Sequence, residues 1–311
     1  MKTEKVAAAL LTALAGASPD RRIPVGGQAV IEGVLMKGSS RWGLSIRRPD
    51  GEIESESWGL KSWTTSMPWK LPLIRGVVTM VEMMTVGFKA LDKSAKIAVG
   101  EEDSITFKEM AITVAIAILA VVGLFIALPL WTSDLAAGRW GLSATGKNVL
   151  EGCIRGVVFI AYVGGIGLWG EIRQVFRYHG AEHKTINAYE AGAPMTVESI
   201  KKYSRIHPRC GTSFLLIVVA VSILVFSLAG AGSILWRIGS RVVLLPLVMG
   251  ISYEIIRGAS CSGTFGRALM WPAMTLQYLT TREPDEGQIE VALTSLETAF
   301  QRKFEKTPEE D

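Results

Sequence analysis

The chain has 311 residues, of which 49% are hydrophobic, and its mean hydropathy is +0.31. This composition favours a membrane protein over two ordinary soluble domains, so the lipid bilayer is its expected partner. The net charge of +4 gives no indication of a nucleic-acid-binding protein, and three widely spaced cysteines do not indicate a disulfide framework.

Residues 1–22 start with basic residues and continue into a short alanine-rich run, which superficially resembles a signal peptide. Because Glu4 lies at the edge of that run, we expect a flexible N-terminal segment that is not cleaved. Residues 23–66 then form a small β-rich region. Residues 44–48 and 52–58 flank a Pro-Asp-Gly turn, a pattern typical of a β-hairpin.

Two polar residues, Gln28 and Glu32, interrupt an apolar strand framed by Gly27 and Gly33. One interpretation is an alternating strand with one solvated face. The other is a backbone that comes close to a ligand, with Glu32 pointing at it. Gln28 and Glu32 are therefore candidates for positions next to a functional site.

The region 67–107 contains a predicted helix over residues 74–98, whose charges make it a poor membrane span. We expect this helix to lie at the membrane interface or to pack on protein. A bundle over residues 108–257 follows, with four apolar spans at 110–131, 149–170, 213–228 and 242–256. Arg155 is expected to lie near one end of its span, and Glu254 to pair with Arg257.

Basic residues are dense in the loop 172–209, whereas the link 132–148 carries only Arg139 and Lys147. By the positive-inside rule the loop 172–209 is cytoplasmic, and an even number of spans places both termini there too. The sequence therefore predicts a mainly α-helical, multi-pass protein of the cytoplasmic membrane. Its small N-terminal β-sheet and its C-terminal region, residues 258–311, lie on the cytoplasmic side.

Two helices outside the bundle begin with N-cap signals. Thr196 is the predicted N-cap of a short helix. Asp285 begins a helix with Ile289, Leu293 and Leu296 on one stripe. Such an amphipathic helix is expected to dock on the sheet or on the preceding helices.

His179, Glu182 and His183 form the pattern H-x-x-E-H in a stretch expected to be helical. Residues four apart lie one turn apart, so both imidazoles leave the same face, with Glu182 beside them. This is the inverted zincin arrangement, in which two histidines bind a divalent metal ion, zinc being the best match, and the carboxylate takes a proton from water. The alternative is a polar helix face, with Glu182 paired to Lys184 or Arg177.

Two histidines hold a metal ion loosely, so a third protein ligand is required. His207 and Cys210 lie just downstream, before the third span. They rank above Glu190, which lies nearly two helical turns beyond His183. The structural alternatives are a hydrogen-bonded histidine at 207 and a small buried hydrophobe at 210.

Four stretches together connect the chain to a known family: Gly26-Gly-Gln-Ala-Val-Ile-Glu-Gly33, Tyr178-His-Gly-Ala-Glu-His-Lys184, His207-Pro-Arg-Cys-Gly-Thr-Ser213 and Leu279-Thr-Thr-Arg-Glu-Pro284. The chain resembles the YqhQ family, bacterial membrane proteins of unknown function that are catalogued as predicted metal-dependent enzymes. The resemblance implies a multi-pass protein and metal dependence, and it supplies no substrate.

Two classes of function follow. The first is a metal-dependent membrane hydrolase at the cytoplasmic interface, with Glu182 as the base. The second is a non-enzymatic scaffold, regulator or transporter whose polar cluster is structural. A transporter should carry polar residues deep in its spans, whereas the mid-span positions of this sequence are expected to be apolar.

Overall fold

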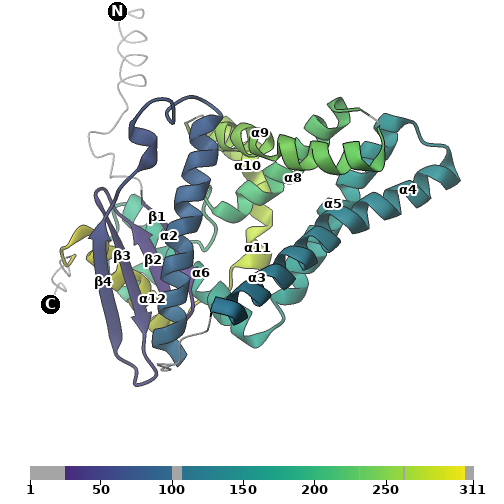
Figure 1. Ribbon diagram of the computed structural model, residues 1–311. Helices are drawn as coiled ribbons and strands as arrows, with labels where there is room; N and C mark the ends of the chain where they lie inside the picture. Colours follow the sequence, from purple (N-terminus) through teal and green to yellow (C-terminus); the bar gives the residue numbers. More distant parts are fainter. Residues whose placement is uncertain (1–24, 100–106, 231, 262, 305–311) are drawn as a thin grey trace, which may run out of the picture.

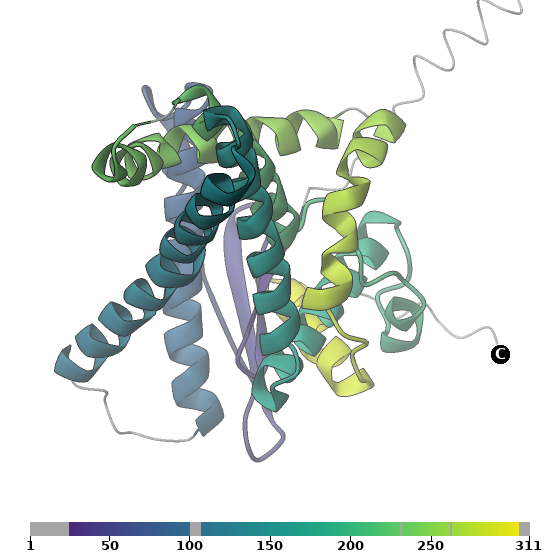
Figure 2. The same ribbon diagram turned by 90° about the vertical axis from the view of Figure 1, so that its right-hand side faces the viewer.

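The computed structural model describes residues 25–99, 107–230, 232–261 and 263–304, and the chain is mainly helical (Figures 1 and 2). The prediction for residues 1–22 lies outside the described residues. The four strands are β1 (Gly26–Val30), β2 (Gly33–Lys37), β3 (Arg41–Arg47) and β4 (Ile53–Gly59).

The helices follow the sheet in the chain. They are α2 (Ile74–Val99), α3 (Phe107–Val122), α4 (Leu128–Trp140), α5 (Ala144–Ile166), α6 (Gly170–Glu190), α7 (Val197–Lys201), α8 (Gly211–Leu228), α9 (Ile234–Cys261), α10 (Gly263–Thr275), α11 (Gln277–Thr280) and α12 (Glu286–Phe300). A π-helical stretch, η2 (Gly123–Ala127), joins α3 to α4 without a break.

The sheet is an antiparallel meander in the order β1-β2-β3-β4, with helices on both faces (Figure 1). Successive side chains of a strand point to opposite faces. Val34 and Met36 therefore pack with α12, and Leu35 packs in the separate cluster that contains Ala90 of α2. The predicted hairpin of residues 44–58 is confirmed by the pairing of β3 with β4.

The C-terminal helix docks on the sheet, as predicted. Asp285 is its N-cap and forms a capping box with Gln288, while Ile289 and Leu296 are fully buried. The Ser295 hydroxyl donates to the carbonyl oxygen of Val34 at 2.8 Å. The predicted N-cap at Thr196 is also confirmed, at the start of α7.

The prediction that Glu32 lies within a strand is wrong. Val30 pairs directly with Gly33, so Ile31 and Glu32 form the tight turn between β1 and β2. The backbone of Glu32, the second residue of this turn, has a φ of +49°, the positive sign that a type II turn has at that position. The glycine at position 33 begins β2 and was a signal for this turn rather than for one long strand.

Four helical stretches are long and apolar enough to cross a membrane: Ala111–Trp140, Thr145–Ile166, Gly211–Leu228 and Leu235–Ala259. This confirms the four predicted apolar spans, and the first and fourth are longer than predicted. Large apolar side chains on them are exposed, such as Leu119 at 71% and Leu228 at 80%. Apolar surface of this extent indicates contact with lipid or with other protein.

Two predictions about charged residues of the bundle are corrected. Arg155 lies near the middle of α5, buried beside Glu151, so the mid-span positions are not uniformly apolar. Glu254 of α9 accepts hydrogen bonds from Arg75 of α2, with Nε to Oε1 at 2.7 Å, rather than pairing with Arg257. Both charged residues have a charged partner, Arg155 within its own helix and Glu254 on another helix, because an unpaired buried charge is costly.

Candidate metal centre

Helix α6 carries the H-x-x-E-H motif and runs unbroken to Glu190, in contact with β1 and β2. Its segment from Tyr178 to Tyr189 is largely buried. His179 and His183 lie on the same face, with ring centroids 4.4 Å apart. The predicted helical spacing of the two imidazoles is therefore confirmed.

A cysteine completes this face. Cys210 is the N-cap of α8, and its Sγ lies 3.3 Å from Nε2 of His179. The ligand atoms of His179, His183 and Cys210 all lie within 4.8 Å of one another. We call these three residues the thiol–imidazole cluster. Two nitrogens and one sulfur at this spacing form a donor set that suits zinc.

Backbone carbonyl groups orient both imidazoles of the cluster. Nδ1 of His179 lies 2.9 Å from the carbonyl oxygen of Thr280, and Nδ1 of His183 lies 2.6 Å from that of Arg205. A carbonyl oxygen only accepts, so each Nδ1 carries a proton and donates it. Nε2 of each ring therefore keeps its lone pair free to bind a metal ion, the arrangement common in metal-ligating histidines.

The electrostatics also favour neutral imidazole. Burial lowers the pKa of His183, and the neighbouring His179 lowers it further. His183 is therefore neutral at pH 7, which is the form that binds metal.

Glu182 lies beside the cluster and packs against the sheet. It is buried, and its Oε2 has no hydrogen-bond partner within the described part of the chain. Burial raises the pKa of Glu182 to about 7, against a lowering effect of His179. A carboxyl group with such a pKa can both accept and return a proton near neutral pH.

His207 lies next to the cluster but is engaged elsewhere. Its ring centroid is 5.8 Å from that of His183. Its Nε2 lies 3.4 Å from Oε2 of Glu190, and its Nδ1 accepts from the backbone N–H of Arg209 at 3.3 Å. Both ring nitrogens therefore have protein partners, and Cys210 fits the third ligand position better.

Glu190 holds His207 and Arg209 in place. It accepts hydrogen bonds from His207 and from Arg209. Burial alone would raise the pKa of Glu190, but the His207 bond and the Arg209 charge outweigh it and lower the pKa below its ordinary value. Glu190 therefore acts as an anion that fixes the loop ahead of α8.

Gln28 and Glu32 connect the sheet to helices. Glu32 accepts from the hydroxyl of Tyr178 at 3.0 Å and from Gln174 at 3.5 Å, both on α6. The carboxamide of Gln28 lies against Gly87 of α2. The Glu32 contacts join the β1–β2 turn to α6, whereas the Gln28 contact joins β1 to α2.

Several residues that shape the site escaped the sequence analysis. The carbonyl groups of Thr280 and Arg205 leave no side-chain signal. Gly180 lets α6 approach the carbonyl oxygen of Arg282 so closely that a Cβ would overlap it, and Arg282 N donates to Phe176 O at 2.8 Å. The stretch Leu279–Pro284, which contributed to the family resemblance, was the available signal.

The fold and site define a mainly helical protein that has four helices long enough to cross a membrane and a thiol–imidazole cluster between α6 and the start of α8. Residues 71–302 match the family described as "Protein of unknown function (DUF1385)". The chain is also 31% identical over 287 residues to "Uncharacterized protein YqhQ" of Bacillus subtilis (strain 168), covering 87% of this chain and 90% of that protein. The chain therefore belongs to the YqhQ (DUF1385) family, as the resemblance indicated. No solved structure matches it significantly.

Proposed function

We propose that this protein is a metal-dependent membrane hydrolase whose metal ion is held by His179, His183 and Cys210. The observation that carries the proposal is the convergence of three ligand atoms within 4.8 Å, with both imidazoles oriented through Nδ1. Four apolar helices support a place in the cytoplasmic membrane, and the basic loop 172–209 supports a site and termini on the cytoplasmic side.

Zinc suits this donor set, because thiolate and imidazole are its usual protein ligands. Three protein ligands leave a fourth position, as in catalytic zinc sites. A bound zinc ion supplies Lewis acidity, which polarises a substrate carbonyl or phosphoryl oxygen and makes water more acidic.

Glu182 is the proposed general base. Its buried Oε2 has no hydrogen-bond partner among the described residues, so it is free to take a proton from water. Glu182 lies three residues after His179 on α6, a spacing that makes the two side chains neighbours on the helix surface.

A structural role for the same cluster is the second candidate. His183 and Cys210 are both buried, and the cluster with its carbonyl partners ties together α6, the Arg205 segment, α8 and α11. A metal ion in that position would fasten the loop to the bundle of a scaffold or regulator without any catalysis.

Elemental analysis of the purified full-length protein tests the metal. We expect about one zinc per chain in the wild type and in Glu182→Gln, and none in the His179→Ala, His183→Ala double variant. His207→Gln is the matched control and should keep its zinc, because His207 is engaged with Glu190. Stoichiometric metal in the double variant would rule the site out.

A catalytic assay then distinguishes the two candidate functions, the hydrolase and the structural role. Hydrolysis of a panel of peptide and phospholipid substrates by the wild type, and its loss in the zinc-bearing Glu182→Gln variant, supports the hydrolase. Equal product formation by both proteins would exclude Glu182 as the base and favour the scaffold.

A further inference from the structure

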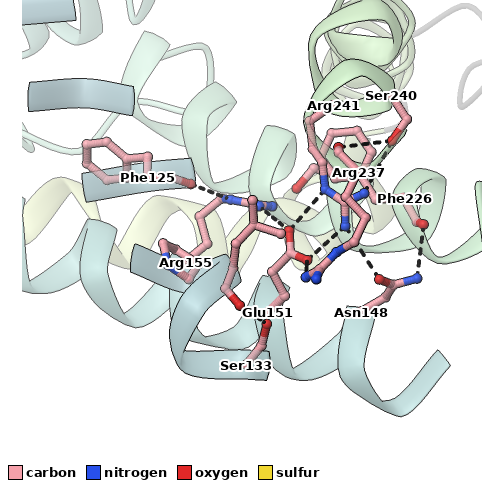
Figure 3. Close-up of polar contacts among 12 residues, drawn as sticks. Phe125, Ser133, Asn148, Glu151, Arg155, Phe226, Arg237, Ser240 and Arg241 are labelled. Carbon is pink, nitrogen blue, oxygen red and sulfur yellow. Dashed lines mark hydrogen bonds and ion pairs between the residues drawn. The ribbon is translucent and has the colours of Figure 1, made fainter. Parts of the chain in front are cut away.

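A second group of polar and charged side chains lies among the long apolar helices (Figure 3). It is near the C-terminal end of α8, whereas the thiol–imidazole cluster is at the N-terminal end of that helix. Helix α8 begins beside the thiol–imidazole cluster, and Phe226 of its last turn accepts from Asn148 of α5 at 3.3 Å. Six charged residues gather around that contact, and we call them the charged cluster: Asp134, Lys147, Glu151, Arg155, Arg237 and Arg241.

Glu151 is the centre of this cluster, and its side chain is only 1% exposed. Its carboxylate accepts from Arg155 at 2.7 Å, from Arg241 at 2.8 and 3.1 Å, and from Arg237 at 3.2 Å. Three guanidinium groups from two helices therefore share one buried carboxylate.

The rim of the cluster is open to the surroundings. Asp134 accepts from Nη1 of Arg237 at 2.7 and 2.9 Å, and it also pairs with Lys147. The side chains of Asp134 and Lys147 are 40% and 27% exposed. A polar route thus leads from the surface of the bundle to the buried arginines.

The inner end of the cluster meets the π-helical stretch η2. Nε of Arg155 donates to the carbonyl oxygen of Phe125 at 2.9 Å. A π-helical turn interrupts the regular hydrogen-bond ladder of a helix and is frequent at functional sites. Arg155 and Arg241 also lie over the ring of Phe226, at 5.6 and 5.2 Å from its centroid.

The charges of the cluster do not balance. Four cations face two carboxylates, and no other carboxylate within the described ranges pairs with them. Arginine does not lose its proton in proteins, so the surplus cannot be removed by titration. Buried surplus charge is costly and calls for a counter-ion. Moreover, Nε of Arg237 is buried without a hydrogen-bond partner in the described structure.

We propose that the charged cluster binds a phosphate-bearing anion, supplied either by a phospholipid headgroup or by free phosphate. Planar guanidinium groups match the oxygens of phosphate, and a partly exposed lysine at the rim adds a point charge. The proposal requires neither the metal ion nor any hydrolysis, so its test is separate from that of the thiol–imidazole cluster.

The source of the anion is distinguished by two measurements on the full-length protein. Native mass spectrometry of protein purified from phosphatidylglycerol nanodiscs should show about one phospholipid retained per chain if a headgroup binds. Delipidated protein titrated with inorganic phosphate should bind it in calorimetry if a free anion binds. The proposal would be overturned if the protein retained no phospholipid and also failed to bind phosphate.

Variants link the binding to the cluster. Arg237→Gln should weaken binding of the probe about tenfold, the usual loss for one charge-assisted hydrogen-bonding partner. Because Arg237 also joins two carboxylates, Lys147→Gln at the partly exposed rim is the second variant and should weaken binding while the protein stays folded. Arg139→Gln is the matched control, an exposed arginine on α4 outside the cluster. Equal binding by Lys147→Gln and Arg139→Gln proteins would refute the assignment.

Discussion

Gly27 of β1 lies directly against the side chain of Glu182 in α6. A Cβ at position 27 would lie 2.9 Å from both Cγ and Cδ of Glu182, and 2.8 Å from the carbonyl oxygen of Leu35. The sheet can close over α6 only because residue 27 has no side chain. This contact couples the N-terminal region to the carboxylate next to the thiol–imidazole cluster.

Gly27→Ala should therefore destabilise the protein by about 1–3 kcal/mol, the usual cost of overpacking a filled contact. Thermal unfolding in detergent measures the effect. Gly26→Ala is the control, because a Cβ there meets no atom within 4 Å, and its change should stay within about 0.5 kcal/mol. Equal melting temperatures for the two variants would contradict the close contact.

Cobalt spectra should identify the third ligand. In Co²⁺-substituted protein we expect a thiolate-to-cobalt charge-transfer band, because the Cys210 sulfur lies 3.3 Å from Nε2 of His179. Cys210→Ser should abolish that band, and His207→Gln should leave it unchanged. A band that survives in Cys210→Ser would show that the sulfur is not a ligand.

Gly180→Ala should weaken zinc binding without removing a ligand. The added methyl group would push away the Arg282 carbonyl, and with it the neighbouring Thr280 carbonyl that orients His179. Loss of such an orienting partner typically costs about 10–100-fold in metal affinity. Competition with a chelator measures this change. Gly170→Ala, at the open start of the same helix, should bind zinc like the wild type.

The orientation of the bundle is tested by reporter fusions at Gly138 and Gly192. Gly138 lies near the end of α4, and Gly192 follows α6, so one span separates them. The charge bias of the loops predicts that the two reporters lie on opposite sides of the membrane. Reporters on the same side would contradict both the topology and the interfacial site.

Local signals predicted the elements that position the site. The i, i+4 spacing of His179 and His183 fixed their shared face on α6, and the Asp285 cap with its apolar stripe fixed α12. The choice between His207 and Cys210 had no local signal. It depends on how the loop before α8 folds, which lets Glu190 engage the histidine and leaves the cysteine facing His179.

The interior of the bundle was less predictable. Hydropathy averages over a window, so it identifies a span without showing which charges face inward. Glu151 and Arg241 are 90 residues apart in the chain, and their pairing exists only in the packed bundle. The turn at Glu32 was likewise hidden, because a two-residue connection between apolar strands resembles one continuous strand.

Helix α8 is one continuous helix that connects the thiol–imidazole cluster to the charged cluster. Cys210 caps the start of this helix and Phe226 lies in its last turn, about 24 Å further along at about 1.5 Å per residue. The backbone hydrogen bonds of an unbroken helix resist stretching, so both ends move together. A sliding of α8 that draws Cys210 away from His179 also carries Phe226 past Arg155 and Arg241 by the same distance.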